Sequence, residues 1–293
     1  MATPPVAHLL VSARNQLGEN PLWDASRQVL FWTDINAGEL HVWREGMIKE
    51  RPIYTGPKVG GFTLESDGAL LLFRVNDLAR FDPDTGDCRS MRTFTDPGTE
   101  RFNDVMADPA GRVFAGTIGH TKDSGGLFRF DPDGSVHPLF RGTGVSNGMG
   151  LSPDGRTFYW TCSTTNHIFA FDYEAATGAL ANRRVFYAAK AEEEGTCDGL
   201  CVDANGDIWS ARWDGHCLRH HAPDGKVIGE IAVPASRVTS CCFGGKQAKT
   251  LFITSARGET DPGYCEAGSV FTAEVKTAGL PRHCSRLALT PPV

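Results

Sequence analysis

The chain has 293 residues and a mass of 31.7 kDa. Its composition, 41% hydrophobic and 22% charged, is that of an ordinary globular protein and excludes a disordered chain. The net charge of -6, with a pI of about 5.8, excludes the basic surface that nucleic acid or anionic lipid requires, so the predicted partner is a small molecule or a protein.

The predicted location is the cytoplasm, with no membrane contact. The stretch up to Gln16 has neither the basic flank nor the apolar core of a signal peptide, and no apolar run approaches bilayer length. Nine cysteines, an odd number without paired C-x-x-C sets, are interpreted as buried free thiols in a reducing compartment. Cys197 and Cys201 would share one face of a strand.

Six similar units follow one another along the chain. Each begins with a turn and an apolar strand, as in WDASRQVLFWTD, LESDGALLLFRV, ADPAGRVFAGT, LSPDGRTFYWTC, VDANGDIWSARW and the more degenerate FGGKQAKTLFITSAR. A further strand and a Gly-containing turn follow, as in GLFRFDPDG, because glycine accepts the positive φ of such turns. The units start roughly 40 to 50 residues apart, which is the length of one four-stranded propeller blade.

The repeat predicts an all-β protein built as one domain, a six-bladed β-propeller over residues 1–293. Two β-sandwiches are the alternative, but they give no reason for six units in the same phase. The most irregular insert is YAAKAEEEGT, residues 187–196. This acidic loop either serves the region it leads into or is a solvated loop without a role.

The phase of the repeat selects four polar residues. They lie five positions before the first turn of their units: Glu19, Asn103, Asn147 and Asp198. The same position falls on Gly60 or Gly61 in the second unit and near Ser240 in the sixth. Equivalent positions of a closed ring converge on its axis, so these side chains should face one another in a central channel. The alternative is that each belongs to an ordinary turn, as Asn-Gly and Asp-Gly pairs often do.

Two carboxylates at close range require a shared proton or a cation. The oxygen ligands of Glu19, Asp198 and Asn147 suit a hard divalent ion such as Ca²⁺, Mg²⁺ or Mn²⁺ and do not exclude Zn²⁺ or Fe²⁺. Three protein ligands would leave positions open for water and substrate, which is typical of a catalytic site. Arg101, two residues before Asn103, would point the same way along its strand.

The loops that follow the second strand of each unit should return to the same end of the channel. They carry a set of candidate wall residues: Asp34, His120, Ser163, Thr164, Trp213 and Arg257. His120 offers a hydrogen-bonding group and Trp213 a stacking surface, although a plain structural role at the rim is equally compatible with either.

Several ordered motifs resemble the gluconolactonase family that includes senescence marker protein (regucalcin), luciferin-regenerating enzyme and bacterial sugar lactonases. They are LGENPLWD, ERFNDVMADPAGRVFAGT, VSNGMGLSPDGRTFYWTC, FDYEAATGALANRRVFY, DGLCVDANGDIW and TSCCFGGK, between about Leu17 and Tyr264. The resemblance implies a six-bladed propeller with one divalent metal in the channel, which hydrolyses sugar lactones to aldonic acids.

The resemblance also implies residue roles. Glu19, Asn147 and Asp198 would be the metal ligands. Arg101 would hold substrate hydroxyls or carboxyl oxygens, and Asn103 would contact the metal region or the substrate. His120 stands where regucalcin-like members place an acidic substrate-contacting residue. Asp198 could then activate the attacking water as a general base, and no G-x-S-x-G nucleophile elbow is present. The alternatives are a calcium- or metal-binding propeller with little hydrolase activity and a propeller that serves as a protein-interaction platform.

Overall fold

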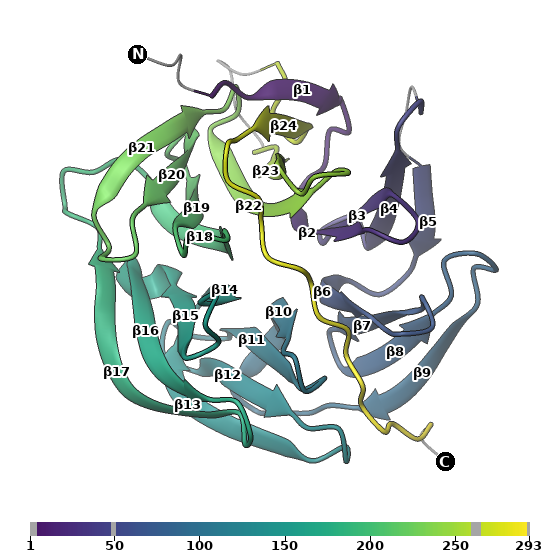
Figure 1. Cartoon of the computed structure of the whole chain (residues 1–293). Coiled ribbons are helices and arrows are strands. Elements are labelled where there is room, and N and C mark those ends of the chain that lie inside the picture. Colours follow the sequence, from purple (N-terminus) through teal and green to yellow (C-terminus); the bar gives the residue numbers. More distant parts are fainter. Residues whose placement is uncertain (1–4, 48–50, 259–264, 292–293) are drawn as a thin grey trace.

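The computed structural model describes residues 5–47, 51–258 and 265–291. Six antiparallel four-stranded sheets are arranged in a ring (Figure 1), which confirms the predicted all-β, six-bladed propeller. In the described residues the single helical element is the short 3-10 turn Ser163–Thr165. No helix in these ranges is long and apolar enough to cross a membrane.

The strands of each blade follow one another outward from the channel. Blades one and two contain β2 (Gly18–Asp24), β3 (Val29–Asp34), β4 (Glu39–Arg44) and β5 (Arg51–Thr55), then β6 (Val59–Leu64), β7 (Leu70–Arg74), β8 (Asp77–Phe81) and β9 (Cys88–Thr93). Blades three and four contain β10 (Thr99–Ala107), β11 (Val113–Gly119), β12 (Gly125–Phe130) and β13 (Val136–Thr143), then β14 (Ser146–Leu151), β15 (Thr157–Cys162), β16 (His167–Glu174) and β17 (Ala179–Ala188). Blade five contains β18 (Thr196–Val202), β19 (Ile208–Trp213), β20 (Cys217–His221) and β21 (Val227–Ala232). Blade six contains β22 (Arg237–Gly244), β23 (Thr250–Ala256), β24 (Val270–Glu274) and β1 (His8–Val11).

The ring is closed by the N-terminal strand. β1 pairs antiparallel with β24, so blade six combines one strand from the start of the chain with three from the end. Figure 1 shows β1 lying beside β24 at the outer edge of this blade. The repeat pattern did not predict this closure, because β1 lies before the first recognisable unit.

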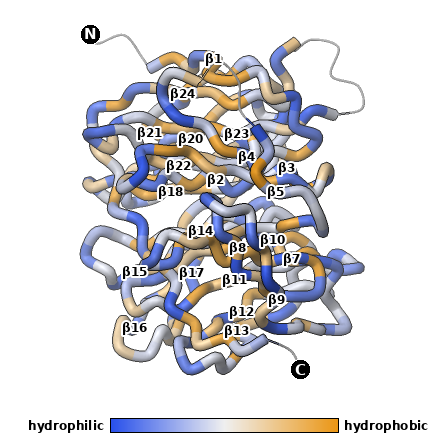
Figure 2. The backbone as a smooth tube through the Cα atoms, turned by 90° about the vertical axis from the view of Figure 1, so that its right-hand side faces the viewer, coloured by the Kyte–Doolittle hydropathy of each residue, from blue (hydrophilic) through white to orange (hydrophobic). Residues whose placement is uncertain are grey.

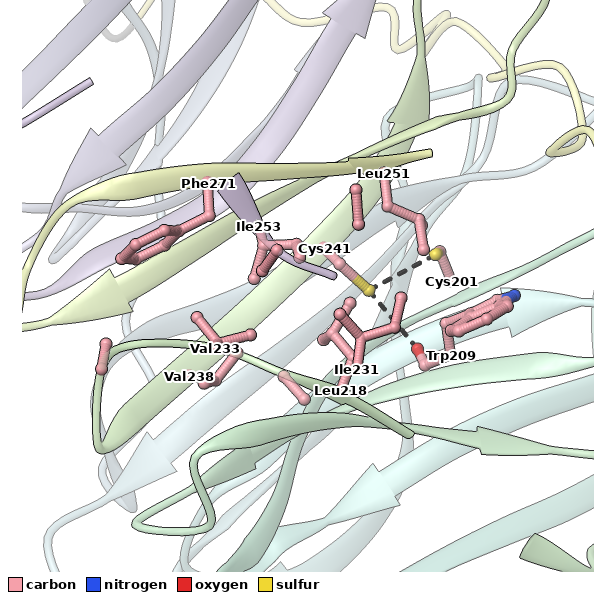
Figure 3. Close-up of a cluster of buried hydrophobic side chains, with 14 of the residues drawn as sticks. Cys201, Trp209, Leu218, Ile231, Val233, Val238, Cys241, Leu251, Ile253 and Phe271 are labelled. Carbon is pink, nitrogen blue, oxygen red and sulfur yellow. Dashed lines mark hydrogen bonds between the residues drawn. The ribbon is translucent and has the colours of Figure 1, made fainter. Parts of the chain in front are cut away.

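Hydrophobic cores lie between neighbouring blades, one for each of the six blade pairs. Figure 2 shows hydrophobic residues concentrated along the strands and hydrophilic residues along many connecting loops. Figure 3 shows the core between blades five and six, where Cys201 and Trp209 meet Cys241 and Ile253. Burial of these apolar surfaces holds each blade against the next and fixes the positions of the innermost strands.

The cysteines are free thiols in the structure, and six of the nine are buried. Cys88 and Cys265 are exposed and Cys284 is half-buried, so the prediction of burial was wrong for these three. The Sγ atoms of Cys201 and Cys241 lie 3.4 Å apart (Figure 3), which is a contact between thiols and not a disulfide bond.

The C-terminal strap, residues 275–291, crosses the end of the channel where the turns between first and second strands lie (Figure 1, yellow). Its backbone N–H groups bind three blades: Gly279 donates to blade six (2.7 Å), Ser285 to blade two (2.9 Å) and Arg286 to blade three (2.9 Å). Leu287 packs in the core between blades two and three. The strap therefore covers this end of the channel and leaves the opposite end for the predicted site.

Candidate active site

The innermost strand of every blade contains a β-bulge at the same level. In β2, Glu19 pairs with Thr33 and Leu22 with Phe31, so β2 has one residue more than β3 between these pairs. The innermost strands β10, β14 and β18 each have one extra residue at the same place. β6 and β22 have an extra residue at the corresponding place. A bulge re-aims the side chains beside it. The position five residues before the turn, which the sequence singled out, therefore lies at a β-bulge in each of these blades.

The bulges bring the predicted polar residues together. Glu19, Asn103, Asn147 and Asp198 are each 4% exposed, and all four line one pocket of about 550 Å³. Arg101 lines the same pocket. The four residues come from blades one, three, four and five, so the pocket lies at the common axis of the ring.

A chain of hydrogen bonds fixes the amides of this pocket. Arg101 Nη1 donates to Asn103 Oδ1 (2.8 Å), and Asn103 Nδ2 donates to Asn147 Oδ1 (2.7 Å). Asn147 Nδ2 then donates to Ser163 Oγ (2.9 Å), which donates to the carbonyl of Cys197 (2.6 Å). The guanidinium of Arg101 can only donate, so it must bond the oxygen of the Asn103 amide. This fixes the orientation of the Asn103 amide and makes its Nδ2 the donor to Asn147. Asn147 keeps a second lone pair on Oδ1 for another partner.

Ionisation of the two carboxylates in the pocket is unfavourable, because both are buried close to other negative charges. Burial, followed by the charge of Asp104, raises the pKa of both Glu19 and Asp198 well above the ordinary range. Asp198 Oδ1 is buried and has no hydrogen-bond partner among the described residues. A hard divalent cation would fit this set of oxygen ligands, which consists of the two buried carboxylates and the amide oxygen of Asn147.

Asp104 is a third channel carboxylate that the sequence analysis missed. It is 6% exposed, Oδ1 lacks a partner in the described chain, and burial raises its pKa to about 7. The positive charge of Arg282 in the C-terminal strap, and to a lesser extent that of Arg101, lowers the pKa of Asp104 and partly offsets the effect of burial. Simple strand alternation puts Asp104 on the face opposite to Asn103, but the bulge between Phe102 and Val105 breaks the alternation.

Two predicted wall residues lie elsewhere. His120, Ser163, Thr164 and Trp213 line the pocket, as predicted, whereas Asp34 and Arg257 do not. The Asp34 carboxylate accepts hydrogen bonds from the backbone N–H groups of residues 16 (2.7 Å) and 17 (3.0 Å), so it holds the entry to β2. The wall prediction was wrong for Asp34 because a loop carboxylate can bond its neighbouring backbone.

The acidic insert is anchored to blade five. Glu193 accepts hydrogen bonds from Tyr187 Oη and from Arg219 Nη1, and the fully buried Arg212 donates to the carbonyl of Gly195 (2.8 Å). Because Gly195 lies three residues before Asp198, these contacts hold the start of β18. This favours the predicted role of the loop in serving the Asp198 region over that of a solvated loop.

The bulge at Asp198 also separates Cys197 from Cys201. Cys197 belongs to the core between blades four and five, and Cys201 to the core between blades five and six. The prediction that they share a face was wrong, since one extra residue reverses the alternation between them.

A second group of potential ligands lies away from the pocket. Single atoms of Asp203, Asp207 and His220 lie within 4.8 Å of one another. Asp203 Oδ1 already accepts two backbone N–H groups, at 2.9 and 3.1 Å, and His220 bonds Asp207 at 3.0 Å. These contacts stabilise the β18–β19 turn and explain the cluster without a metal.

Comparison with known proteins identifies the family of this propeller. The model of the SMP-30/gluconolactonase/LRE-like region matches residues 17–257, which include all four channel residues. The chain belongs to this family. It is 37% identical to the pentonolactonase XacC of Haloferax volcanii, over 96% of this chain and 98% of that protein. It is 33% identical to regucalcin of Danio rerio, over 84% of this chain and 85% of that protein.

The fold of this SMP-30/gluconolactonase/LRE-like chain also occurs in solved structures. The crystal structure of a regucalcin from Agrobacterium tumefaciens, described as a calcium-binding protein, superimposes with a TM-score of 0.88 at 27% identity. The alignment covers 98% of this chain and all of that chain. The predicted family resemblance is therefore confirmed by sequence and by fold.

Proposed function

We propose that the protein is a metal-dependent lactonase that hydrolyses sugar lactones to the corresponding aldonic acids. The observation that carries this proposal is the pair of buried carboxylates, Glu19 and Asp198, on the floor of an open pocket of about 550 Å³. A site of this size accommodates a small molecule. The similarity to a pentonolactonase supports a lactone as the substrate.

Glu19, Asn147 and Asp198 are the proposed ligands of one divalent metal ion. Carboxylate and amide oxygens suit Ca²⁺, Mg²⁺ or Mn²⁺, and Zn²⁺ or Fe²⁺ are also compatible with them. The calcium-binding description of the Agrobacterium regucalcin supports a divalent metal in general. A bound ion would also neutralise the carboxylates whose pKa values burial raises.

The residues of the chain have distinct proposed roles in lactone opening. Glu19, Asn147 and Asp198 would hold a divalent metal ion, which when bound would act as a Lewis acid on the lactone carbonyl. Asp198, through the carboxylate oxygen that does not bind the metal, takes a proton from the attacking water and later returns it to the ring oxygen that leaves. Arg101 and Asn103 orient the substrate from blade three, and Asn103 also fixes Asn147 through the 2.7 Å hydrogen bond. His120 contacts substrate hydroxyls from the rim.

The test is acid release from a panel of aldonolactones in a weakly buffered indicator assay. Protein stripped with a chelator is compared with protein refilled by each divalent metal in turn, against no-enzyme and free-metal controls. Hydrolysis that returns with metal supports the proposal and ranks metals and lactones. Absence of hydrolysis with metal bound contradicts it.

The second candidate is a metal-binding propeller without hydrolase activity, since the same oxygen ligands would serve both functions. The calcium-binding description of the Agrobacterium regucalcin supports this candidate. The open pocket with Arg101 beside the floor favours the enzyme. The cytoplasm is the proposed location. The neighbouring thiols of Cys201 and Cys241 do not form a disulfide bond, which fits its reducing conditions.

A further inference from the structure

The pocket has a negative floor and a positive wall. The carboxylates that line it among the described residues are Glu19 and Asp198, both buried at the floor. Two cationic residues line it as well, Arg101 next to the floor and Lys122 at the exposed rim. Charges that share a pocket act together on a ligand, because its low-dielectric walls concentrate their field.

The positive charge of Lys122 is not balanced within the substrate space, whereas that of Arg101 is attracted by the carboxylates of Glu19, Glu100, Asp104 and Asp198. A divalent cation held by Glu19 and Asp198, as in the proposed function, would cancel their two negative charges. Asp104 does not line the pocket, and Arg282 of the strap faces it from the other end of the channel. Asp123, next to Lys122 in sequence, accepts a hydrogen bond from Thr121 Oγ1 (2.7 Å) and does not line the pocket.

Lys122 is held in place by its loop. Ser124 Oγ accepts the backbone N–H of Thr121 (2.9 Å) and donates to the carbonyl of Gly98 (2.8 Å). The Lys122 backbone packs so closely on Gly144 that a Cβ added to this glycine would lie 2.7 Å from Lys122 Cα. Within the part of the chain that the structure describes, the Lys122 ammonium forms no ion pair with a carboxylate. The fixed backbone therefore presents a free positive charge at the rim.

Arg101 has hydrogen-bonding capacity left over. Its Nη1 atom donates to Asn103 Oδ1 (2.8 Å) and to the carbonyl of Phe102 (2.9 Å), which fixes the plane of the guanidinium. No hydrogen bond from its Nε or Nη2 is present among the described residues. The planar edge of a guanidinium matches the two oxygens of a carboxylate.

We propose that the preferred substrate is a sugar lactone that carries a carboxylate of its own, and that Lys122 is the residue that selects it. This inference rests on the proposed function, whose site it deepens. The floor binds the lactone group, while Arg101 and Lys122 attract the second, negatively charged end of the molecule. A neutral lactone would leave Lys122 without an anionic partner and the free edge of Arg101 without a carboxylate to bind, which lowers its affinity relative to the charged lactone.

The experiment compares kcat/KM for three lactones of equal carbon number: a neutral aldonolactone, the monolactone of an aldaric acid, and a phosphorylated aldonolactone. Wild type, Lys122→Met and Lys246→Met are measured. Lys246 is a matched control, since it is exposed in the β22–β23 turn at the opposite end of the propeller. We expect wild type and the control to prefer the aldaric lactone. Lys122→Met should lose about tenfold on this lactone and less than about twofold on the neutral one.

Salt provides an independent readout. The preference of wild type should shrink as ionic strength rises, because an exposed charge is screened. Equal or better turnover of the neutral lactone, or an unchanged preference in Lys122→Met, would overturn the inference. Preference for the phosphorylated lactone would overturn the assignment of a carboxylate. If no lactone is hydrolysed, the lactonase proposal fails, and calorimetric binding of the intact neutral and aldaric lactones still decides the charge preference.

Discussion

Three side chains dominate the chemistry of the channel at the residue scale. Glu19, Asp104 and Asp198 are buried at 4 to 6% exposure, and their pKa values are all raised by burial. Each is therefore unfavourable in its ionised form unless a cation is near. Residues that oppose folding in this way are typical of functional sites, where the cost is offset when the ligand binds.

Replacement of Asp198 by Asn tests its role as general base. The amide can still coordinate a metal but cannot take a proton, so we expect turnover to fall by at least about 10²-fold. The fold should be retained, and both proteins are refilled with excess metal before the comparison, because Asp198→Asn, like Glu19→Gln, removes one of the two floor carboxylates. Lactone hydrolysis and elemental analysis on the same preparations make the comparison. Near wild-type turnover in Asp198→Asn would remove the general-base role.

Asp104 gives the metal-free protein a defined pH dependence. Its pKa is about 7 in the folded chain and about 3.8 without the protein environment, so the native state binds this proton more tightly. Stability of the metal-free protein should therefore fall as pH rises between about 4 and 7. Asp104→Asn should reduce this slope, as measured by urea unfolding in the presence of a chelator. Asp123→Asn, at an exposed carboxylate, is the control, and equal slopes in wild type and Asp104→Asn would contradict the account.

The repeated bulge organises the site at the scale of elements. The bulges lie so close to neighbouring strands that side chains are excluded at several of them. A Cβ added to Gly60 would lie 2.0 Å from the carbonyl oxygen of Phe102, and one added to Gly148 would lie 2.4 Å from the backbone N of Leu200. Glycine at these points lets the innermost strands of adjacent blades approach each other.

Gly148→Ala tests this close approach. The added methyl group must displace the strand that carries Asp198, so we expect a loss of about 1–3 kcal/mol in the free energy of unfolding together with lower turnover. Gly229→Ala in β21 is the control, because a Cβ there meets nothing within 4 Å. Unfolding curves and lactone kinetics decide the outcome. Equal stability of the two variants would show that the bulge tolerates a side chain.

The sequence predicted the elements better than their irregularities. Glu19, Asn103, Asn147 and Asp198 could be found because a repeat shows which positions are equivalent. Asp104 could not, since recognising it requires knowledge that an extra residue breaks the strand alternation. The separation of Cys197 from Cys201 has the same cause.

Two long-range features complete the fold at the scale of the whole molecule. β1 closes the ring on β24, and the strap closes one end of the channel. Neither belongs to a repeat unit, and each depends on contacts between distant parts of the chain. The sequence pattern could not predict them because periodicity describes only local structure.

Removal of residues 1–11 should open the ring. Blade six would lose its outer strand and leave β24 with an unpaired edge, so we expect the thermal midpoint to fall by roughly 10 °C. Removal of residues 1–6, which precede β1, is the matched control and should have little effect. Calorimetry of both truncated chains provides the comparison. Equal midpoints would show that β1 is not needed for closure.

The most direct test of the account is metal stoichiometry measured together with lactone hydrolysis on the same stripped and refilled protein. We expect one divalent metal per chain, loss of hydrolysis when it is removed and recovery when it is restored. Glu19→Gln should retain less metal and lose activity in proportion, since it removes one of two floor carboxylates. Full hydrolysis by metal-free protein, or unchanged metal content in Glu19→Gln, would contradict the proposed metal centre.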